Sequence, residues 1–219
     1  MLLRLIAGVA LCFATVPGTA LAKTKADATF TFPKDKPVKI VLFRPDVEVG
    51  SLGASGVPTP NPDWTANSRK YTLEALVQNR TAKSMAINPM GELTGADGEF
   101  VAEYQSLFQA VGASMLVHNY AQKLPTKKLP GGKYKFDWTL GPGAQHLREL
   151  SGGADYGLFI YGYDAYATAG RKTMQIFVLL ATAAMGAAQL PQGGLHISYA
   201  SLVDFQTGNI VWFNLYGNK

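Results

Sequence analysis

The sequence predicts an α/β fold of the α+β sandwich type. It consists of a mixed sheet of about five strands, two to three helices packed on it and a C-terminal β-hairpin. Aromatic and β-branched runs at 38–43 and 156–166 are typical of buried strands. Segments with apolar residues at helical spacing lie between them. The runs 196–204 and 209–215 flank a Thr-Gly pair, and glycine accepts the positive φ of a tight hairpin.

Three helices are expected between these strands. The first spans 65–83, with Thr65 as its candidate N-cap. The second spans 98–112, and residues 113–119 either extend it or form a short strand, because Gly112 interrupts the apolar pattern. The third spans 141–150, where a proline suits the first helical turn.

The other segments are irregular. Residues 50–63 are rich in glycine and proline without periodicity, which predicts a loop, and long loops often carry function. Residues 134–138 alternate as an edge strand does. Residues 23–37 are polar and lysine-rich, which predicts an extended leader before a single domain at 38–219.

The N-terminal segment 1–22 has the plan of a secretory signal peptide. Arg4 precedes an apolar run at 5–16, a Pro-Gly pair breaks the run, and Ala20-Leu21-Ala22 forms an A-x-A cleavage site. An uncleaved anchor is the alternative, although a membrane span needs about 20 apolar residues. Cleavage after Ala22 predicts a periplasmic protein, with peripheral membrane association as a further option.

The only cysteine, Cys12, lies within this segment, so the rest of the chain has no disulfide and no thiolate ligand. The formal net charge of +5 at pH 7 is mild. Lysines cluster at 23–39 and 123–135, below the density of a nucleic-acid-binding arm, so no nucleic-acid partner is expected. These clusters are either a solvated face or a weak attraction to anionic lipid headgroups.

An apolar insertion is expected at 171–194. It is uncharged over 173–190 and most apolar over 176–188. Three alternatives remain open: a buried or amphipathic helix, a segment for self-association or partner binding, and a membrane-inserting segment. The candidate interaction residues are its large side chains: Ile176, Phe177, Leu179, Leu180 and Met185.

No catalytic signature is recognisable in the sequence. His118, His146 and His196 lack metal-ligand spacing, and no serine elbow or phosphate loop is present. We therefore predict no enzyme activity, cofactor or metal. Three acids at late strand ends stabilise turns or, in a weaker hydrolase alternative, meet at one sheet edge as paired carboxylates: Asp155, Asp164 and Asp204.

Two further residue sets are candidates for defined roles. Phe159, Tyr161 and Tyr163 alternate along one strand, so they share a face and either pack against a helix or line a ligand groove. The residues expected to shape turns are Gly153, Asp155, Asp204, Thr207 and Gly208.

The order of these parts resembles a known family. Gly153-Ala154-Asp155-Tyr156 opens a strand, and the final hairpin carries Val203, Asp204, Thr207, Gly208, Ile210, Val211 and Trp212. These motifs resemble the α/β domain shared by the curli secretion lipoprotein CsgG, the N-terminal domain of TolB and the penicillin-binding-protein activator LpoB. The resemblance covers 38–219 loosely and 146–214 more closely. Residues 44–53 and 63–76 also resemble a group of alphaproteobacterial exported envelope proteins.

The resemblance implies a non-catalytic periplasmic or envelope factor that acts by protein–protein contact in envelope assembly or secretion, with envelope proteins or its own copies as partners. The contact would use the 50–63 loop, the 171–190 segment or an exposed strand edge. A lipid-bearing cysteine and the alternation of a barrel hairpin are both missing, so neither a lipid anchor nor a CsgG-like pore is expected. The alternative function is a periplasmic binder of small ligands such as cell-wall fragments or glycans.

Overall fold

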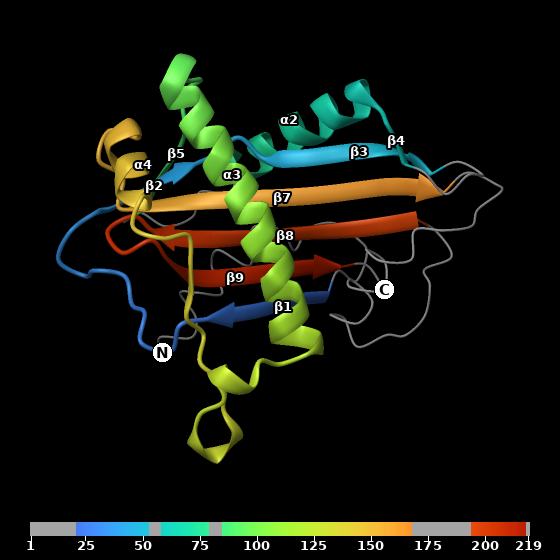
Figure 1. Ribbon diagram of the computed structural model, residues 1–219. Helices are drawn as coiled ribbons and strands as arrows, with labels where there is room; N and C mark the ends of the chain where they lie inside the picture. Colours follow the sequence, from blue (N-terminus) through green and yellow to red (C-terminus); the bar gives the residue numbers. More distant parts are fainter. Residues whose placement is uncertain (1–20, 53–57, 79–84, 168–193, 218–219) are drawn as a thin grey trace.

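The structure is a computed structural model that describes residues 21–52, 58–78, 85–167 and 194–217 (Figure 1). These residues form a nine-stranded mixed sheet with helices packed on it, which confirms the predicted fold class. The strands are β1 (Leu21–Ala26), β2 (Val38–Leu42), β3 (Asp46–Leu52), β4 (Pro58–Pro60), β5 (Met85–Pro89), β6 (Trp138–Thr139), β7 (Tyr156–Ala167), β8 (Gly194–Asp204) and β9 (Asn209–Gly217). The α-helices are α2 (Pro62–Gln78), α3 (Gly95–Leu116) and α4 (Ala144–Leu150).

Strand β7 is the centre of the sheet. On one side the order is β8, β9 and β1, all antiparallel to their neighbours. On the other side two strands follow one another along β7, first β2 and then β3, both parallel to it. Beyond them, β5 pairs with β2 and β4 pairs with β3. On this second side, β5 and β4 are therefore two separate edge strands.

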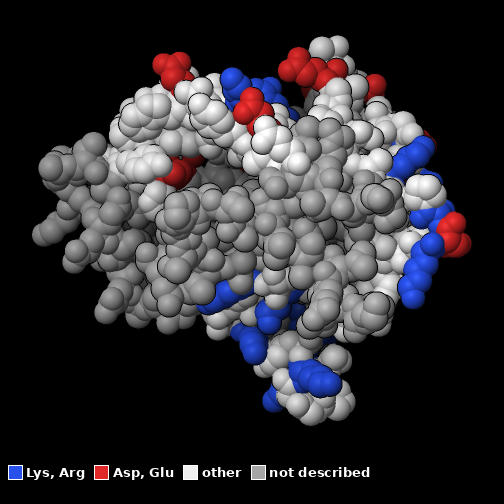
Figure 2. Space-filling model, turned by 180° about the vertical axis from the view of Figure 1, so that it is seen from behind, with Lys and Arg blue, Asp and Glu red and all other residues white. Residues whose placement is uncertain are grey.

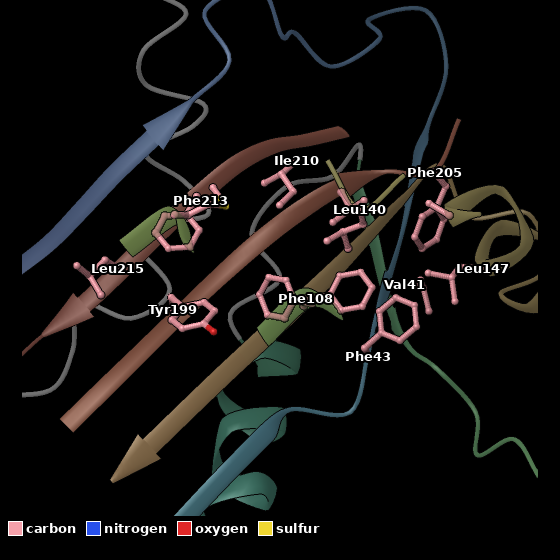
Figure 3. Close-up of a cluster of buried hydrophobic side chains, with 14 of the residues drawn as sticks. Val41, Phe43, Phe108, Leu140, Leu147, Tyr199, Phe205, Ile210, Phe213 and Leu215 are labelled. Atoms are coloured by element: carbon pink, nitrogen blue, oxygen red, sulfur yellow. The ribbon is translucent and has the colours of Figure 1, made fainter. Parts of the chain in front are cut away.

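Helix α3 crosses one face of the sheet diagonally, and α4 lies on the same face (Figure 1). We call this the α3 face. Its core is aromatic: Phe43 stacks on Phe159 with ring centres 4.2 Å apart, and Phe108 and Tyr199 pack nearby (Figure 3). Helix α3 continues through Gly112 to Leu116, so the residues after Gly112 extend the helix, which was the first of the two alternatives. A Cβ at Gly112 would lie 2.3 Å from the Tyr199 ring, so the glycine allows close packing.

The opposite face carries a second apolar cluster built on the inner strands. Leu73 and Leu76 of α2 pack against it at one margin. Phe30 and Phe32 also pack there, with ring centres 4.9 Å apart, in edge contact with Tyr156. The segment interpreted as a leader therefore supplies core side chains, and the sheet already begins at β1, before residue 38 where the domain was expected to start.

Several element boundaries differ from the expected ones. The 50–63 segment contains the end of β3, strand β4 and the start of α2. Helix α2 begins at Pro62 because the Asn61 side chain accepts a hydrogen bond from the Trp64 N–H at 3.0 Å, so Asn61 caps it in place of Thr65. The edge strand expected at 134–138 is reduced to β6, and α4 begins at Ala144.

Two segments with expectations based on the sequence lie outside the described residues. One is residues 1–20 of the expected signal peptide. The other contains the candidate interaction residues Ile176, Phe177, Leu179, Leu180 and Met185. In the part of the chain that the structure describes, no helix is long and apolar enough to cross a membrane.

Candidate functional site

The candidate site begins at the break between β2 and β3. Leu42 pairs with Leu158 and Asp46 pairs with Tyr161, so three residues on this side oppose two on β7. The extra residue between β2 and β3 acts as a β-bulge. After it, the alternation is shifted by one residue, so even-numbered side chains lie on the other face of the sheet. Leu42 therefore belongs to the opposite face, whereas Asp46 lies beside Tyr161 on the α3 face.

Helix α3 holds this break in place with two glutamines one turn apart. Gln105 Nε2 donates a hydrogen bond to the Arg44 carbonyl at 2.9 Å, and Gln109 Nε2 donates one to the Asp46 carboxylate. Pro45 has no N–H to offer a neighbouring strand. Two polar groups at the break, the Arg44 carbonyl and the Asp46 carboxylate, thus have partners on α3.

The outer edge of β3 is only partly covered. Strand β5 follows β2 as far as Pro89, and the Met90 N–H bonds to the Leu42 carbonyl at 2.8 Å. Strand β4 pairs with β3 only from Gly50 onward. Among the described residues, no strand pairs with the outer edge of residues 43–48.

The hydrogen bonds of Val49 show which way the backbone groups of this edge point. Its N–H donates to Thr65 Oγ1 at 3.0 Å, and its carbonyl accepts from the Asn61 N–H at 2.8 Å. Both Val49 backbone groups thus point away from β7, toward α2. Because backbone groups alternate in direction along a strand, those of Val47 point the same way. Within the described chain, no hydrogen bond from Val47 to a partner on that side is formed.

A cleft of about 840 Å³ lies along this edge. One wall is the strand segment with Leu42, Arg44, Asp46 and Glu48, and the other is one face of α2. The α2 residues that line it recur at helical spacing: Thr65, Ala66, Arg69, Lys70, Leu73 and Glu74. Pro60 and Pro62 border the cleft at the β4 end and Pro89 at the β5 end, so neither strand can extend its hydrogen bonding across the gap through these residues.

The cleft is charged with both signs. Its walls carry three basic and four acidic side chains, namely Arg44, Arg69, Lys70, Asp46, Glu48, Glu74 and Glu92. Lys70 and Glu74 lie 4.0 Å apart. Arg69 is half-buried, and its Nε is covered without a hydrogen-bond partner among the described atoms. A carboxylate that enters the cleft meets the cationic guanidinium of Arg69 on the α2 wall.

The aromatic residues proposed as a ligand groove lie elsewhere. Phe159, Tyr161 and Tyr163 share the α3 face, but Phe159 is only 1% exposed and the two tyrosines pack against the core cluster. Burial, with the nearby Asp46 and Glu48 carboxylates, raises the pKa of Tyr161 to about 12. The three side chains belong to the core on this face and do not line the cleft.

The residues expected to shape turns lie in two turns. Asp204 accepts from the Gln206 N–H at 2.9 Å and from the Thr207 hydroxyl at 3.1 Å, and Gly208 adopts a φ of 75°. Gly153 adopts a φ of 82° before β7. Asp155 accepts from Lys36 Nζ at 3.0 Å and from the Lys39 N–H at 3.1 Å. Burial raises the pKa of Asp155, but these two partners together hold it below its ordinary value.

The three late aspartates do not meet at one edge, as the hydrolase alternative requires. Asp155 and Asp204 lie near Tyr156, at the start of β7. Asp164 lies near the end of β7, where its Oδ1 is 2.5 Å from Nδ1 of His196. His118 stacks on Trp138, and His146 lies 2.9 Å from Glu149. Across the described ranges, no three His, Cys, Asp or Glu side chains gather as a metal-ligand set.

Sequence reasoning did not identify the cleft residues. The strand predicted at 38–43 stops just before Arg44-Pro45, although Asp46, Val47, Glu48 and Val49 alternate as a new strand does. That alternation was the only local signal. No protein-family model matches the chain, and no curated protein matches it.

Proposed function

We propose that this protein is a non-catalytic factor of the bacterial periplasm or envelope that acts by protein–protein contact, and that it binds an extended segment of its partner in the cleft between β3 and α2. The observation that carries the proposal is the outer edge of residues 43–48, which has no strand partner among the described residues. An extended segment that adds to such an edge gains main-chain hydrogen bonds independent of its sequence.

The cleft also supplies the elements of specificity. A segment lying along β3 would place alternate side chains toward α2, where Arg69, Lys70 and Glu74 offer both charge signs. Arg69 suits a carboxylate or a carbonyl of the segment, and Glu48 suits a basic side chain. The periplasmic location rests on the signal-peptide pattern of residues 1–22.

The test is selection of peptides from a random library of about eight residues, a length that spans the open edge at roughly 3.3 Å per residue. We expect selected peptides to bind the full chain and to lose at least about tenfold in affinity to Arg69→Glu and to Glu48→Lys. Lys34→Glu and Glu99→Lys, which change exposed charges outside the cleft, serve as matched controls.

Two results would contradict the proposal. One is that no extended peptide is selected. The other is that selected peptides bind the cleft variants and the control variants equally, because the binding surface would then lie elsewhere. Residue-resolved hydrogen exchange completes the test, since a bound segment must slow exchange of the Val47 amide.

A further inference from the structure

A second surface lies at the far side of the sheet from the cleft. We call it the basic lobe and define it as residues 117–138 together with Lys23 and Lys25 of β1. In Figure 1 the chain that follows α3 extends beyond the β1 edge of the sheet. The Tyr120 hydroxyl donates to the Lys23 carbonyl at 2.7 Å. The Nζ atoms of Lys23 and Lys25 each lie 5.9 Å from the Tyr120 ring centre. Two lysine clusters far apart in the sequence are thereby joined.

The basic lobe has a strong local excess of positive charge. It contains seven lysines and one carboxylate: Lys23, Lys25, Lys123, Lys127, Lys128, Lys133, Lys135 and Asp137. Asp137 lies 2.5 Å from Lys127 Nζ and 3.2 Å from Lys135 Nζ, so it neutralises charge only in that pair. Figure 2 shows the basic side chains gathered at the projecting lower end of the molecule.

The tip of the basic lobe is an ordered turn. The Leu129 N–H donates to the Lys133 carbonyl at 2.7 Å, and the Lys135 N–H donates to the Lys127 carbonyl at 2.8 Å. Lys127 Nζ also lies 4.0 Å from the Trp138 ring centre, which fixes the base of the turn. The tip is therefore already shaped before it meets a partner.

Two large apolar side chains are exposed at this tip. Leu129 is 42% exposed and Tyr134 is 39% exposed, and the neighbouring Lys128 and Lys133 are exposed as well. We propose that the basic lobe docks on an anionic lipid surface, with Leu129 and Tyr134 entering the headgroup layer and the surrounding lysines contacting lipid phosphates. Apolar burial and attraction to anionic headgroups are the two contributions that hold peripheral elements on a bilayer.

The shape of the lobe favours a lipid surface over other polyanions. A projecting tip enters a soft, flat headgroup layer, whereas a single-stranded nucleic acid binds along a basic groove with stacking aromatic side chains. In the lobe, Trp138 and Tyr120 are partly buried, so Tyr134, with Lys123 Nζ 4.5 Å from its ring centre, is a single exposed ring rather than a row of stacking aromatic side chains. This inference rests on the lobe alone and does not require the cleft to bind a peptide.

The test is co-sedimentation of the full chain with phosphatidylcholine vesicles that contain about one third phosphatidylglycerol. Binding should be lost on pure phosphatidylcholine and should weaken strongly at about 0.5 M salt. Lys128→Gln with Lys133→Gln should lower the partition coefficient by roughly 25-fold, at about fivefold per lysine. Leu129→Ser should lower it by roughly tenfold. The control is Lys34→Gln with Lys39→Gln, which removes two lysines outside the lobe.

Three outcomes would overturn the inference: no binding to anionic vesicles, equal binding to zwitterionic vesicles, or binding that the lobe variants and the control variant share. Tight binding to a single-stranded oligonucleotide without vesicle binding would overturn it as well, in favour of a nucleic-acid partner. Circular dichroism of each variant checks folding, and the two independent lobe variants keep the test decisive if one of them is unstable.

Discussion

The two sides of β7 are built differently. On one side, β8 pairs with it without interruption from Tyr156 to Tyr166. On the other side, β2 and β3 both pair with β7, one after the other, and a break at residues 43–45 separates them. The uninterrupted side leads into the β8–β9 hairpin and much of the aromatic core, whereas the broken side leaves an edge with which no strand of the described residues pairs.

We therefore expect the two sides to contribute differently, the uninterrupted side to the stability of the fold and the broken side to partner binding. Most side chains of β8 and β9 are buried, alternately on the α3 face and on the opposite face, so substitutions there should act on the free energy of unfolding. Exposed charged side chains line the cleft, among them Arg44, Glu48 and Lys70, so substitutions of these residues should act on partner binding with little effect on folding. Substitutions at buried and at exposed positions of the two sides test that division.

Phe159→Ala should lower the free energy of unfolding by about 3–5 kcal/mol, because it removes a ring that stacks on Phe43 inside the core. Urea denaturation measures the change. Tyr166→Ala on the same strand is the control, since this ring is 50% exposed and its loss should cost far less. A small effect of Phe159→Ala would show that this face is open to solvent and would restore the ligand-groove hypothesis.

Thr65→Val should cost about 1–3 kcal/mol, because the hydroxyl of this buried residue bonds both backbone groups of Val49 at the end of the open edge. Thr72→Val removes a hydroxyl that bonds only within α2 and should cost less. Equal costs in thermal unfolding would mean that Thr65 does not hold α2 to β3.

Asp204→Ala should cost about 1 kcal/mol, because the turn before β9 loses two hydrogen bonds to the carboxylate. Thr207→Ala removes one of the same bonds. In a double-mutant cycle measured by urea denaturation, the two losses should therefore be less than additive. Strict additivity would indicate that the two side chains act independently.

The sequence was informative where structure is local. The strand 38–42 is a short β-rich run after a proline, and the strand 156–167 and the final hairpin are longer runs next to glycine turns, so pattern alone located them. Strand β3 was missed because Pro45 resembles a terminator, and β1 was missed because its lysines resemble a solvated leader. Both become strands only by pairing with β7 and β9, which lie more than a hundred residues away.

The candidate site was less predictable than the fold. The cleft arises from the register of β2 and β3 against β7 and from the position of α2, and neither is encoded in a local motif. The aromatic alternation at 159–163 correctly indicated a shared face. Packing against a helix was one of the two alternatives for this face, but the pattern did not indicate which helix, because helix placement depends on packing across the whole sheet.

The smallest predicted effect is a pH dependence from His196. Its contact with Asp164 raises the pKa of the imidazole above its usual 6.5, although burial opposes the shift. A group with a raised folded-state pKa stabilises the fold below its unfolded pKa, and that contribution is lost as pH rises through the folded value. The pair should therefore contribute less at about pH 9 than at about pH 6, by under about 1 kcal/mol.

Chemical denaturation at both pH values measures this difference. His196→Gln should remove it, whereas His146→Gln, at an exposed pair with Glu149, should leave it in place. A pH dependence that persists in His196→Gln would assign it to another group.

The most direct test of the open edge is residue-resolved amide hydrogen exchange in the free protein. The amide of Val47 points away from β7 without a partner among the described residues, whereas the amide of Val49 bonds Thr65. We predict that Val47 exchanges markedly faster than Val49 and than the central amides of β8. Equal protection of Val47 and Val49 would mean that the edge is already occupied, and it would contradict the account of the cleft as a docking site.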